Sequence, residues 1–119
     1  MSLLIVKHTA RKGLGVFANA HLWRGLRMCL SQTVEIDKPT SGSMADAYAW
    51  QHQGRYLIPL SNISLINHSS RPNARVEFAP STEDPKRFTA AIVTLREIRR
   101  GTEVTVSYGV KPWWKKGSK

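Results

Sequence analysis

Cysteine is nearly absent from this sequence of 119 residues, which contains only Cys29. A single cysteine excludes an intrachain disulfide and a cysteine-rich zinc cluster. The other residues that commonly bind zinc also lack a suitable pattern, because the four histidines, His8, His21, His52 and His68, show no paired spacing. We therefore expect no metal site in the chain.

Long apolar runs are also missing. No apolar segment approaches the roughly 20 residues that a membrane-spanning helix needs. The N-terminal apolar run covers only residues 3–6, which is too short for the apolar region of a signal peptide, and we interpret it as a first strand. The protein is therefore expected inside the cell and away from membranes, in the cytoplasm or, in a eukaryote or a virus, in the nucleus.

Acidic residues are scarce, with 8 Asp and Glu against 18 Lys and Arg, and the formal net charge is +10. The basic excess lies in residues 1–30, which contain no acid, and in residues 91–119, while the middle of the chain is close to neutral. Such asymmetry is typical of a protein that contacts nucleic acid or an acidic protein surface. A solvated basic face without a specific partner explains the charge equally well, so both interpretations stay open.

What the chain does contain is a succession of short aliphatic, β-branched or aromatic runs separated by Gly, Pro, Ser and Asp. Runs of this kind predict a mostly β fold, and the length predicts a single domain. The predicted strands cover residues 3–7, 15–18, 26–34, 55–60, 74–79, 87–95 and 103–108. Gly101 stands where a tight turn between the last two of these strands would need it.

Helical segments are few. Residues 44–53 predict one convincing helix, with Ser43 as its N-cap and Asp46 in its first turn. Residues 62–67 are expected to form a further helical turn. The segment 110–119, VKPWWKKGSK, is a basic tail that contains two tryptophans.

Three short motifs stand out from this pattern: KGLGVFA (12–18), LINHSSRPN (65–73) and TEVTVSYG (102–109). The first has two glycines, which let backbone approach a ligand closely. The second has amide and hydroxyl groups that can fix backbone around a polar ligand. The third is an alternating strand that ends on a tyrosine. Taken singly, each has an ordinary explanation as a hairpin turn, a loop, or a core or surface tyrosine.

Taken in this order and spacing, the motifs resemble those of the SET-domain family of protein lysine methyltransferases, over about residues 4–109. KGLGVFA is similar to the family's Gly-X-Gly segment, LINHSSRPN to its Asn-His-Ser signature, and LREIRRGTEVTVSYG (95–109) to the segment that ends at the catalytic tyrosine. The resemblance implies a β-clip-like fold of several small curled sheets, with one or two short helices and a C-terminal pseudo-knot. Because cysteine-rich flanking modules are absent, residues 1–119 resemble a minimal SET domain of the viral kind, for which we expect a homodimer.

The resemblance also implies S-adenosyl-L-methionine as the cofactor. The Gly-X-Gly segment would close over one side of the cofactor, and the signature would hold the other side. Tyr108 is the implied catalytic residue, which orients the methyl group and the amine with its hydroxyl and is not an obligatory base. The implied cofactor-binding residues are Lys12, Gly13, Leu14, Gly15, Asn67, His68, Tyr108 and Trp113.

The implied substrate is a protein with an exposed lysine, whose side chain enters a narrow aromatic channel. Candidates for the channel walls are Tyr48, Tyr56, Trp113 and Trp114. Methyl transfer from a sulfonium to an amine is an in-line displacement, so it needs positioning and no covalent protein intermediate. The lysine must be neutral, and burial near the sulfonium lowers its pKa because desolvation and a like charge both disfavour the ammonium form.

One departure from the family pattern concerns its acid pair, which here reads Gly101-Thr102-Glu103. We expect this difference not to touch the catalytic residues. Histone tails are disfavoured as the substrate, because enzymes of this family that act on basic tails usually present acidic grooves and this chain is strongly basic. A lysine with acidic neighbours, a protein bound to nucleic acid and a ribosomal protein stay open as alternatives.

Two alternatives to an active enzyme stay open. A small basic β-domain could bind nucleic acid through its positive termini, with Trp113 and Trp114 stacking on bases. A SET fold could also have lost its activity and bind only a cofactor or a partner. The intact Asn67, His68 and Tyr108 favour the active enzyme over this second alternative.

Overall fold

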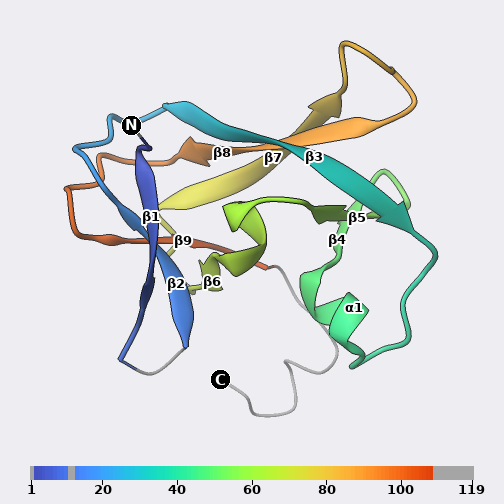
Figure 1. The fold of residues 1–119 in the computed structure, drawn as a ribbon, viewed down its shortest axis with the longest axis horizontal. Helices are drawn as coiled ribbons and strands as arrows, with labels where there is room; N and C mark the ends of the chain where they lie inside the picture. Colours follow the sequence, from blue (N-terminus) through green and yellow to red (C-terminus); the bar gives the residue numbers. More distant parts are fainter. Residues whose placement is uncertain (1, 11–12, 109–119) are drawn as a thin grey trace.

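The computed structural model describes residues 2–10 and 13–108. These residues form two β-sheets, one short α-helix, α1 (Met44–Tyr48), and one 3-10 helix, η1 (Asn62–Leu65). Figure 1 shows the smaller sheet on the left of the molecule and α1 beside the far end of the larger sheet. The mostly β fold with small curled sheets, expected from the sequence, is confirmed.

The four-stranded sheet has the order β1-β2-β9-β6. Its strands are β1 (Leu4–His8), β2 (Leu14–Ala18), β9 (Glu103–Val106) and β6 (Asn67–His68). Neighbours in this sheet are antiparallel except β6 and β9, which run parallel and pair Asn67 with Thr105 and His68 with Val106. The sheet therefore brings the Gly-X-Gly segment, the asparagine–histidine pair and the C-terminal strand together.

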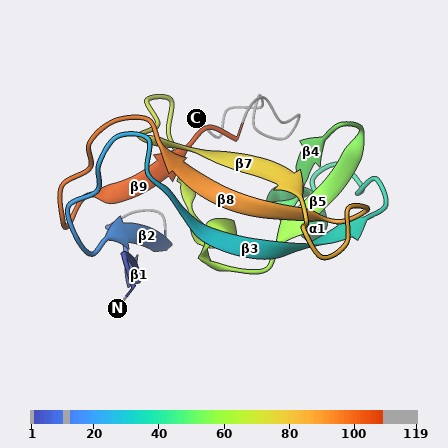
Figure 2. The same ribbon diagram turned by 90° about the horizontal axis from the view of Figure 1, so that it is seen from above.

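The five-stranded sheet is entirely antiparallel and has the order β4-β5-β3-β8-β7. Its strands are β4 (Trp50–His52), β5 (Arg55–Pro59), β3 (Arg27–Ile36), β8 (Phe88–Thr94) and β7 (Ala74–Pro80). Figure 2 shows β3, β8 and β7 side by side as one curved layer, with β4 and β5 at its end. The curvature lets this sheet wrap one side of the core.

The hydrophobic core joins elements of both sheets and η1. β9 contributes Val104 and Val106, which are fully buried on a strand whose residues favour β structure. The other core side chains include Leu4, Val16, Leu22, Met28, Ile63, Ile66, Ile92 and Ile98. Because β9 and η1 are anchored by these apolar contacts, the polar residues that follow each of them are held in defined positions.

The predicted helix over residues 44–53 is correct only in its first half. Ser43 is the N-cap, and its hydroxyl accepts a hydrogen bond from the Asp46 backbone at 3.1 Å. The helix ends at Tyr48, and Trp50–His52 form β4. Residues 50–52 adopt a strand because β4 pairs with β5 and Trp50 packs against Phe78. A continued helix would lose these contacts.

The predicted turn at Gly101 exists, but it does not join two paired strands. The Thr102 backbone donates to the Arg99 carbonyl at 3.1 Å, and Gly101 has a φ of 89°, which suits glycine. However, β8 and β9 belong to different sheets. The chain leaves β8, forms a bridge between Ile98 and Leu22, and turns so that β9 pairs with β2. The turn at Gly101 therefore does not make a hairpin of residues 87–95 and 103–108.

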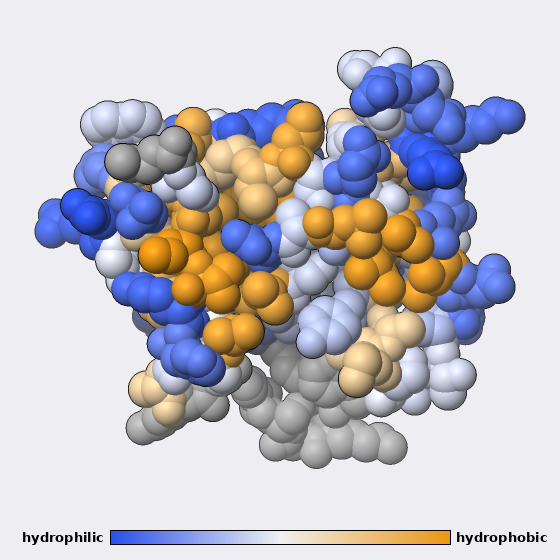
Figure 3. Space-filling model, viewed as in Figure 1, coloured by the Kyte–Doolittle hydropathy of each residue, from blue (hydrophilic) through white to orange (hydrophobic). Residues whose placement is uncertain are grey.

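A bulge in β3 places an apolar side chain on the surface. The pairing of β3 with β8 shifts between Met28 and Ser31, Cys29 has a φ of 58°, and Leu30 is 70% exposed. Figure 3 shows apolar residues gathered over β1 and β2 and, separately, over β3 and β5. Among the residues described, no helix has the length and apolar character needed to cross a membrane.

Candidate active site

The side chain of Asn67 links two of the sequence motifs. Its amide nitrogen donates to the Leu14 carbonyl at 3.0 Å and to the Glu103 carboxylate at 2.8 Å. The first bond holds the Gly-X-Gly segment against β6, and the second ties β6 to the start of β9. Because both hydrogen bonds use the amide nitrogen, they orient the side chain so that its oxygen is the remaining acceptor.

The backbone at Gly15 is closely surrounded. A Cβ atom at this position would lie 2.7 Å from the Thr9 methyl carbon, 2.8 Å from a Glu103 carboxylate oxygen and 3.0 Å from the Asn67 amide nitrogen. No larger residue fits here without displacing one of these groups. Gly13 differs, because it has open space around it but a φ of 74° that favours glycine. The two glycines are therefore needed for different reasons.

Tyr108 lies where β9 ends, directly beside the signature. Its backbone donates to His68 Nδ1 at 3.1 Å, and its hydroxyl donates to the Ile66 carbonyl at 2.5 Å. The His68 ring lies 5.4 Å from the Tyr108 ring. The structure thus brings Asn67, His68 and Tyr108 together, and it gives His68 the structural role of holding the tyrosine.

The Tyr108 phenol is partly buried, and its environment favours the neutral form. Burial raises the pKa of Tyr108 above its ordinary value, and the nearby Tyr48 and Glu103 raise the pKa further because they carry negative charge when ionised. The hydroxyl is therefore protonated at neutral pH. It can donate to Ile66 and still offer an oxygen lone pair to a bound group.

Aromatic residues continue from Tyr108 along the inner side of the larger sheet. The Trp50 ring stands at 85° to the Tyr108 ring, with 5.8 Å between the centroids, and Phe78 lies 6.4 Å beyond Trp50. Tyr48, one of the predicted wall residues, is at the end of α1 and lies close enough to influence the charge of Tyr108. These residues form an apolar wall beside the phenol.

Of the other predicted site residues, one lies away from the aromatic wall and three lie outside the residues that the structure describes. Trp50 pairs with Leu57 across β4 and β5, and Tyr56 precedes Leu57. Since side chains alternate along a strand, Tyr56 lies on the face opposite Trp50. Lys12, Trp113 and Trp114 lie outside the residues that the structure describes.

Two residues of this region were not predicted from the sequence. Trp50 was assigned to the interior of a helix, although the alternation of Trp50 and His52 is also compatible with a strand. Glu103 was considered only as part of the family's acid pair, and its carboxylate accepts a hydrogen bond from Asn67. It comes close because β2 and β6 both lie against β9 and bring their polar groups to its first residue.

Asn73 holds β9 in place from outside the strand. Its amide nitrogen donates to the Glu103 carbonyl at 2.8 Å, and its oxygen accepts from the Thr105 backbone at 2.9 Å. We expect Asn73→Ala to lower the free energy of unfolding by roughly 2–4 kcal/mol, because two backbone groups of β9 lose their partners. Denaturant unfolding followed by circular dichroism measures this change. The control Asn19→Ala loses only an exposed hydrogen bond to Ser2. Equal small losses of unfolding free energy in both variants would show that Asn73 does not hold β9 in place.

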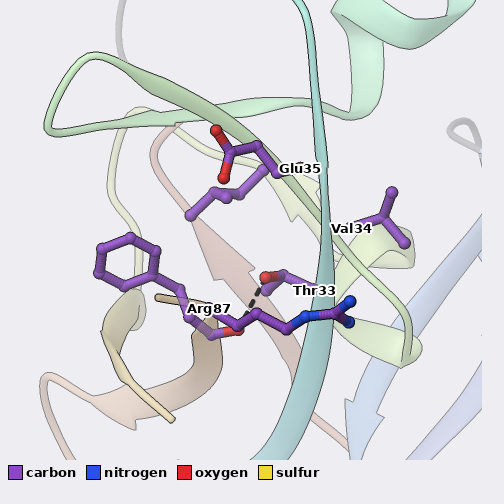
Figure 4. A pocket seen from close by; sticks show the side chains of 6 residues that line it. Thr33, Val34, Glu35 and Arg87 are labelled. Atoms are coloured by element: carbon purple, nitrogen blue, oxygen red, sulfur yellow. Dashed lines mark hydrogen bonds between the residues drawn. The ribbon is translucent and has the colours of Figure 1, made fainter. Parts of the chain in front are cut away.

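A shallow pocket on the larger sheet is separate from this region. It is lined by Thr33, Val34, Glu35, Leu57, Arg87 and Phe88, and Figure 4 shows the Thr33 hydroxyl pointing to the Phe88 carbonyl, to which it donates at 2.7 Å. None of the residues that line it belongs to the three motifs. Across residues 2–10 and 13–108, no three His, Cys, Asp or Glu side chains cluster as a metal site would require.

The fold and this arrangement define a class of protein. Residues 13–109 match the SET domain family, so the chain belongs to the SET-domain family of protein lysine methyltransferases. The chain is similar to the histone-lysine N-methyltransferase ATXR2 of Arabidopsis thaliana, with 38% identity over 77 residues. These residues are 65% of this chain and only 15% of that protein.

Two solved structures share the fold. A candidate histone methyltransferase from Plasmodium falciparum superimposes with a TM-score of 0.79 and 24% identity, and the match covers 95% of this chain and 98% of that chain. The Neurospora SET-domain histone lysine methyltransferase DIM-5 superimposes with a TM-score of 0.69 and 20% identity, over 91% of this chain and 52% of that chain. At these identities the similarity describes the fold.

Proposed function

We propose that this protein transfers a methyl group from S-adenosyl-L-methionine to the ε-amine of a lysine in a protein substrate. The observation that carries the proposal is the position of the Tyr108 hydroxyl, which donates to Ile66 immediately before Asn67 and His68. Membership of the SET-domain family supports the same activity. An inactive scaffold would not need a partly buried, protonated phenol at this position.

The groups around the Gly-X-Gly segment fit such a cofactor. The Asn67 amide oxygen and the Glu103 carboxylate are acceptors suited to the ammonium group of its amino-acid end. Gly13 has open space at the position where a side chain would start, so backbone there can be approached closely. We assign Gly13, Leu14, Gly15, Asn67 and His68 to cofactor binding.

When bound, S-adenosyl-L-methionine supplies an electrophilic methyl group on a positive sulfur. Tyr108 would orient the reacting groups through its oxygen, since its proton is donated to Ile66. The phenol is neutral, because burial raises the pKa of Tyr108. It therefore stabilises the arrangement as a fixed dipole and does not remove a proton, in accord with a displacement that depends on positioning.

The lysine amine must reach this oxygen without its proton. Trp50 and Phe78 provide an apolar wall beside Tyr108, and Tyr48 extends this wall from α1. Desolvation against such a wall lowers the pKa of a lysine, because the ammonium form loses its hydration. We therefore assign Tyr48 and Trp50 to the entry of the substrate side chain.

The substrate sequence is proposed from charge. The chain carries a net charge of +10, which disfavours a strongly basic peptide and favours a lysine flanked by acidic residues. A peptide library in which one lysine has acidic, neutral or basic neighbours, with a labelled methyl donor, gives the assay. The homodimer stays a prediction from the family resemblance.

Cofactor binding is the first test. We expect isothermal titration with S-adenosyl-L-methionine to give a measurable heat, and Asn67→Ala to weaken binding by about 10- to 100-fold, the effect of losing a hydrogen bond to a charged group. Asn19→Ala deletes the same side chain where its hydrogen bond, to the Ser2 carbonyl, is exposed, and should bind as the wild type does. Equal affinity in Asn67→Ala and the wild type would remove Asn67 from the cofactor site.

A further inference from the structure

Two surface segments come together at one end of the molecule. Residues 19–26 connect β2 to β3, and residues 95–102 connect β8 to β9, and both lie at the left end in Figures 1 and 2. The buried Leu22 and Ile98 join the segments through two backbone hydrogen bonds of 2.8 and 2.9 Å. The two segments therefore form one continuous, well-anchored surface.

This surface is strongly basic. Its four arginines, Arg24, Arg96, Arg99 and Arg100, are all exposed, and among the described residues none of them forms an ion pair. The single acid in the two segments is Glu97, whose carboxylate lies 2.7 Å from His21. Arg96 donates one hydrogen bond to the Pro72 carbonyl at 2.9 Å and keeps further N–H donors. The exposed guanidinium groups are therefore available to an anionic partner.

An exposed tryptophan directly precedes Arg24 in the first of these segments. Trp23 is 65% exposed, which is unusual for the largest apolar side chain on a surface. Its backbone is nevertheless fixed, because its carbonyl accepts hydrogen bonds from the Thr94 hydroxyl at 2.5 Å and from the Leu26 backbone at 3.4 Å. The His21 ring meets the Trp23 ring edge-on, with 4.7 Å between centroids. The backbone hydrogen bonds and the His21 ring thus hold the exposed indole in a defined position.

We propose that this arginine–tryptophan surface, formed by Trp23, Arg24, Arg96, Arg99 and Arg100, binds single-stranded nucleic acid. Guanidinium groups contact phosphates with good geometry, and an exposed aromatic ring provides a face on which an unpaired base stacks. An acidic protein segment would use the arginines but would have no need of a bare indole. The combination therefore favours unpaired nucleotides.

The location makes this binding separate from methyl transfer. β9 spans Glu103–Val106, with the arginine-rich segment before its first residue and Tyr108 beyond its last. Figure 1 shows β9 beginning at the left end of the molecule and running toward its centre. Nucleic acid held at this end would bring associated proteins to the enzyme and leave the catalytic groups uncovered.

The test uses a fluorescent oligothymidylate of about 12 nucleotides, a length within the range of single-strand sites, and the full chain. We expect fluorescence anisotropy to show binding whose affinity falls with salt, with a log–log slope of about −3 for four engaged arginines. Trp23→Ala should weaken binding by about 5- to 100-fold through lost stacking, and Trp23→Phe should retain most of the affinity. Arg99→Gln combined with Arg100→Gln should reduce the slope by about half.

Two controls make the result specific. Lys38→Gln with Lys86→Gln removes the same charge elsewhere and should leave the affinity within about twofold of the wild type, since exposed charges at a distance are screened. Trp113→Ala with Trp114→Ala tests the C-terminal tail. Loss of binding in the tail variant but not in Trp23→Ala would overturn the proposal. So would undetectable binding at low salt, or binding insensitive to Trp23 that an equally charged glutamate peptide displaces.

Cofactor titration on the same samples keeps the two proposals apart. Trp23→Ala and the double arginine variant should bind S-adenosyl-L-methionine as the wild type does. A protein that binds the oligonucleotide through Trp23 but gives no cofactor heat would retain this surface and lose the proposed methyl transfer. The reverse result would retain methyl transfer alone.

Discussion

Tyr108→Phe is expected to lower the rate of methyl transfer by about 100-fold or more. This is the usual effect of removing one preorganised hydrogen-bonding group at a reacting centre. The structure explains why the effect should fall on turnover. The phenol oxygen is the only atom removed, and the contacts of the ring with Trp50 and His68 remain. Cofactor affinity should therefore stay within a fewfold of the wild type. Initial rates with the labelled peptide library and isothermal titration measure the two quantities.

Folding must be separated from catalysis in this variant. Losing the hydrogen bond to the Ile66 carbonyl should lower the free energy of unfolding by about 1 kcal/mol, which thermal unfolding will report. Tyr56→Phe is the matched control, because it removes the same oxygen from a tyrosine of β5. Tyr56 lies on the face of the sheet opposite to Trp50 of β4. Its turnover should not change. Full turnover in Tyr108→Phe would exclude the phenol from the mechanism.

Gly15→Ala should abolish measurable cofactor binding and destabilise the protein. The new methyl group would lie under 3 Å from both the Thr9 methyl carbon and the Glu103 carboxylate, and at 3.0 Å from the Asn67 amide nitrogen. These groups must move apart, and overpacking of this kind costs about 1–3 kcal/mol. The displaced Asn67 would no longer hold the Gly-X-Gly segment against β6. Isothermal titration and thermal unfolding measure the two effects.

The control for Gly15→Ala is another glycine whose replacement costs backbone strain alone. Gly54 has a φ of 76° and open space around it, so Gly54→Ala should cost about 1 kcal/mol and leave cofactor affinity unchanged. If Gly15→Ala bound S-adenosyl-L-methionine as tightly as Gly54→Ala does, the crowding at Gly15 would have no part in the cofactor site. A similar loss of stability in both variants with binding lost only in Gly15→Ala would support a local role.

Local features of this protein were determined by contiguous residues. All seven predicted strands overlap strands of the structure, because runs of β-branched and aromatic residues bounded by turn residues prefer extended backbone. Ser43 caps α1 as expected, since an N-cap depends on a hydrogen bond to the first turn of the same helix. The family itself was recognised from three motifs, each of which is a short continuous segment.

Contacts between distant segments were decided by the tertiary structure. Trp50 leaves the predicted helix because packing against Phe78 and Tyr108 outweighs the weak helix preference of a short segment. Glu103 meets Asn67 only because β9 lies between β2 and β6, an order that no local pattern specifies. The arginine–tryptophan surface has the same origin, since the Leu22–Ile98 bridge joins segments far apart in the chain. Residue types set the available chemistry, and burial of the apolar core determined which of these residues meet.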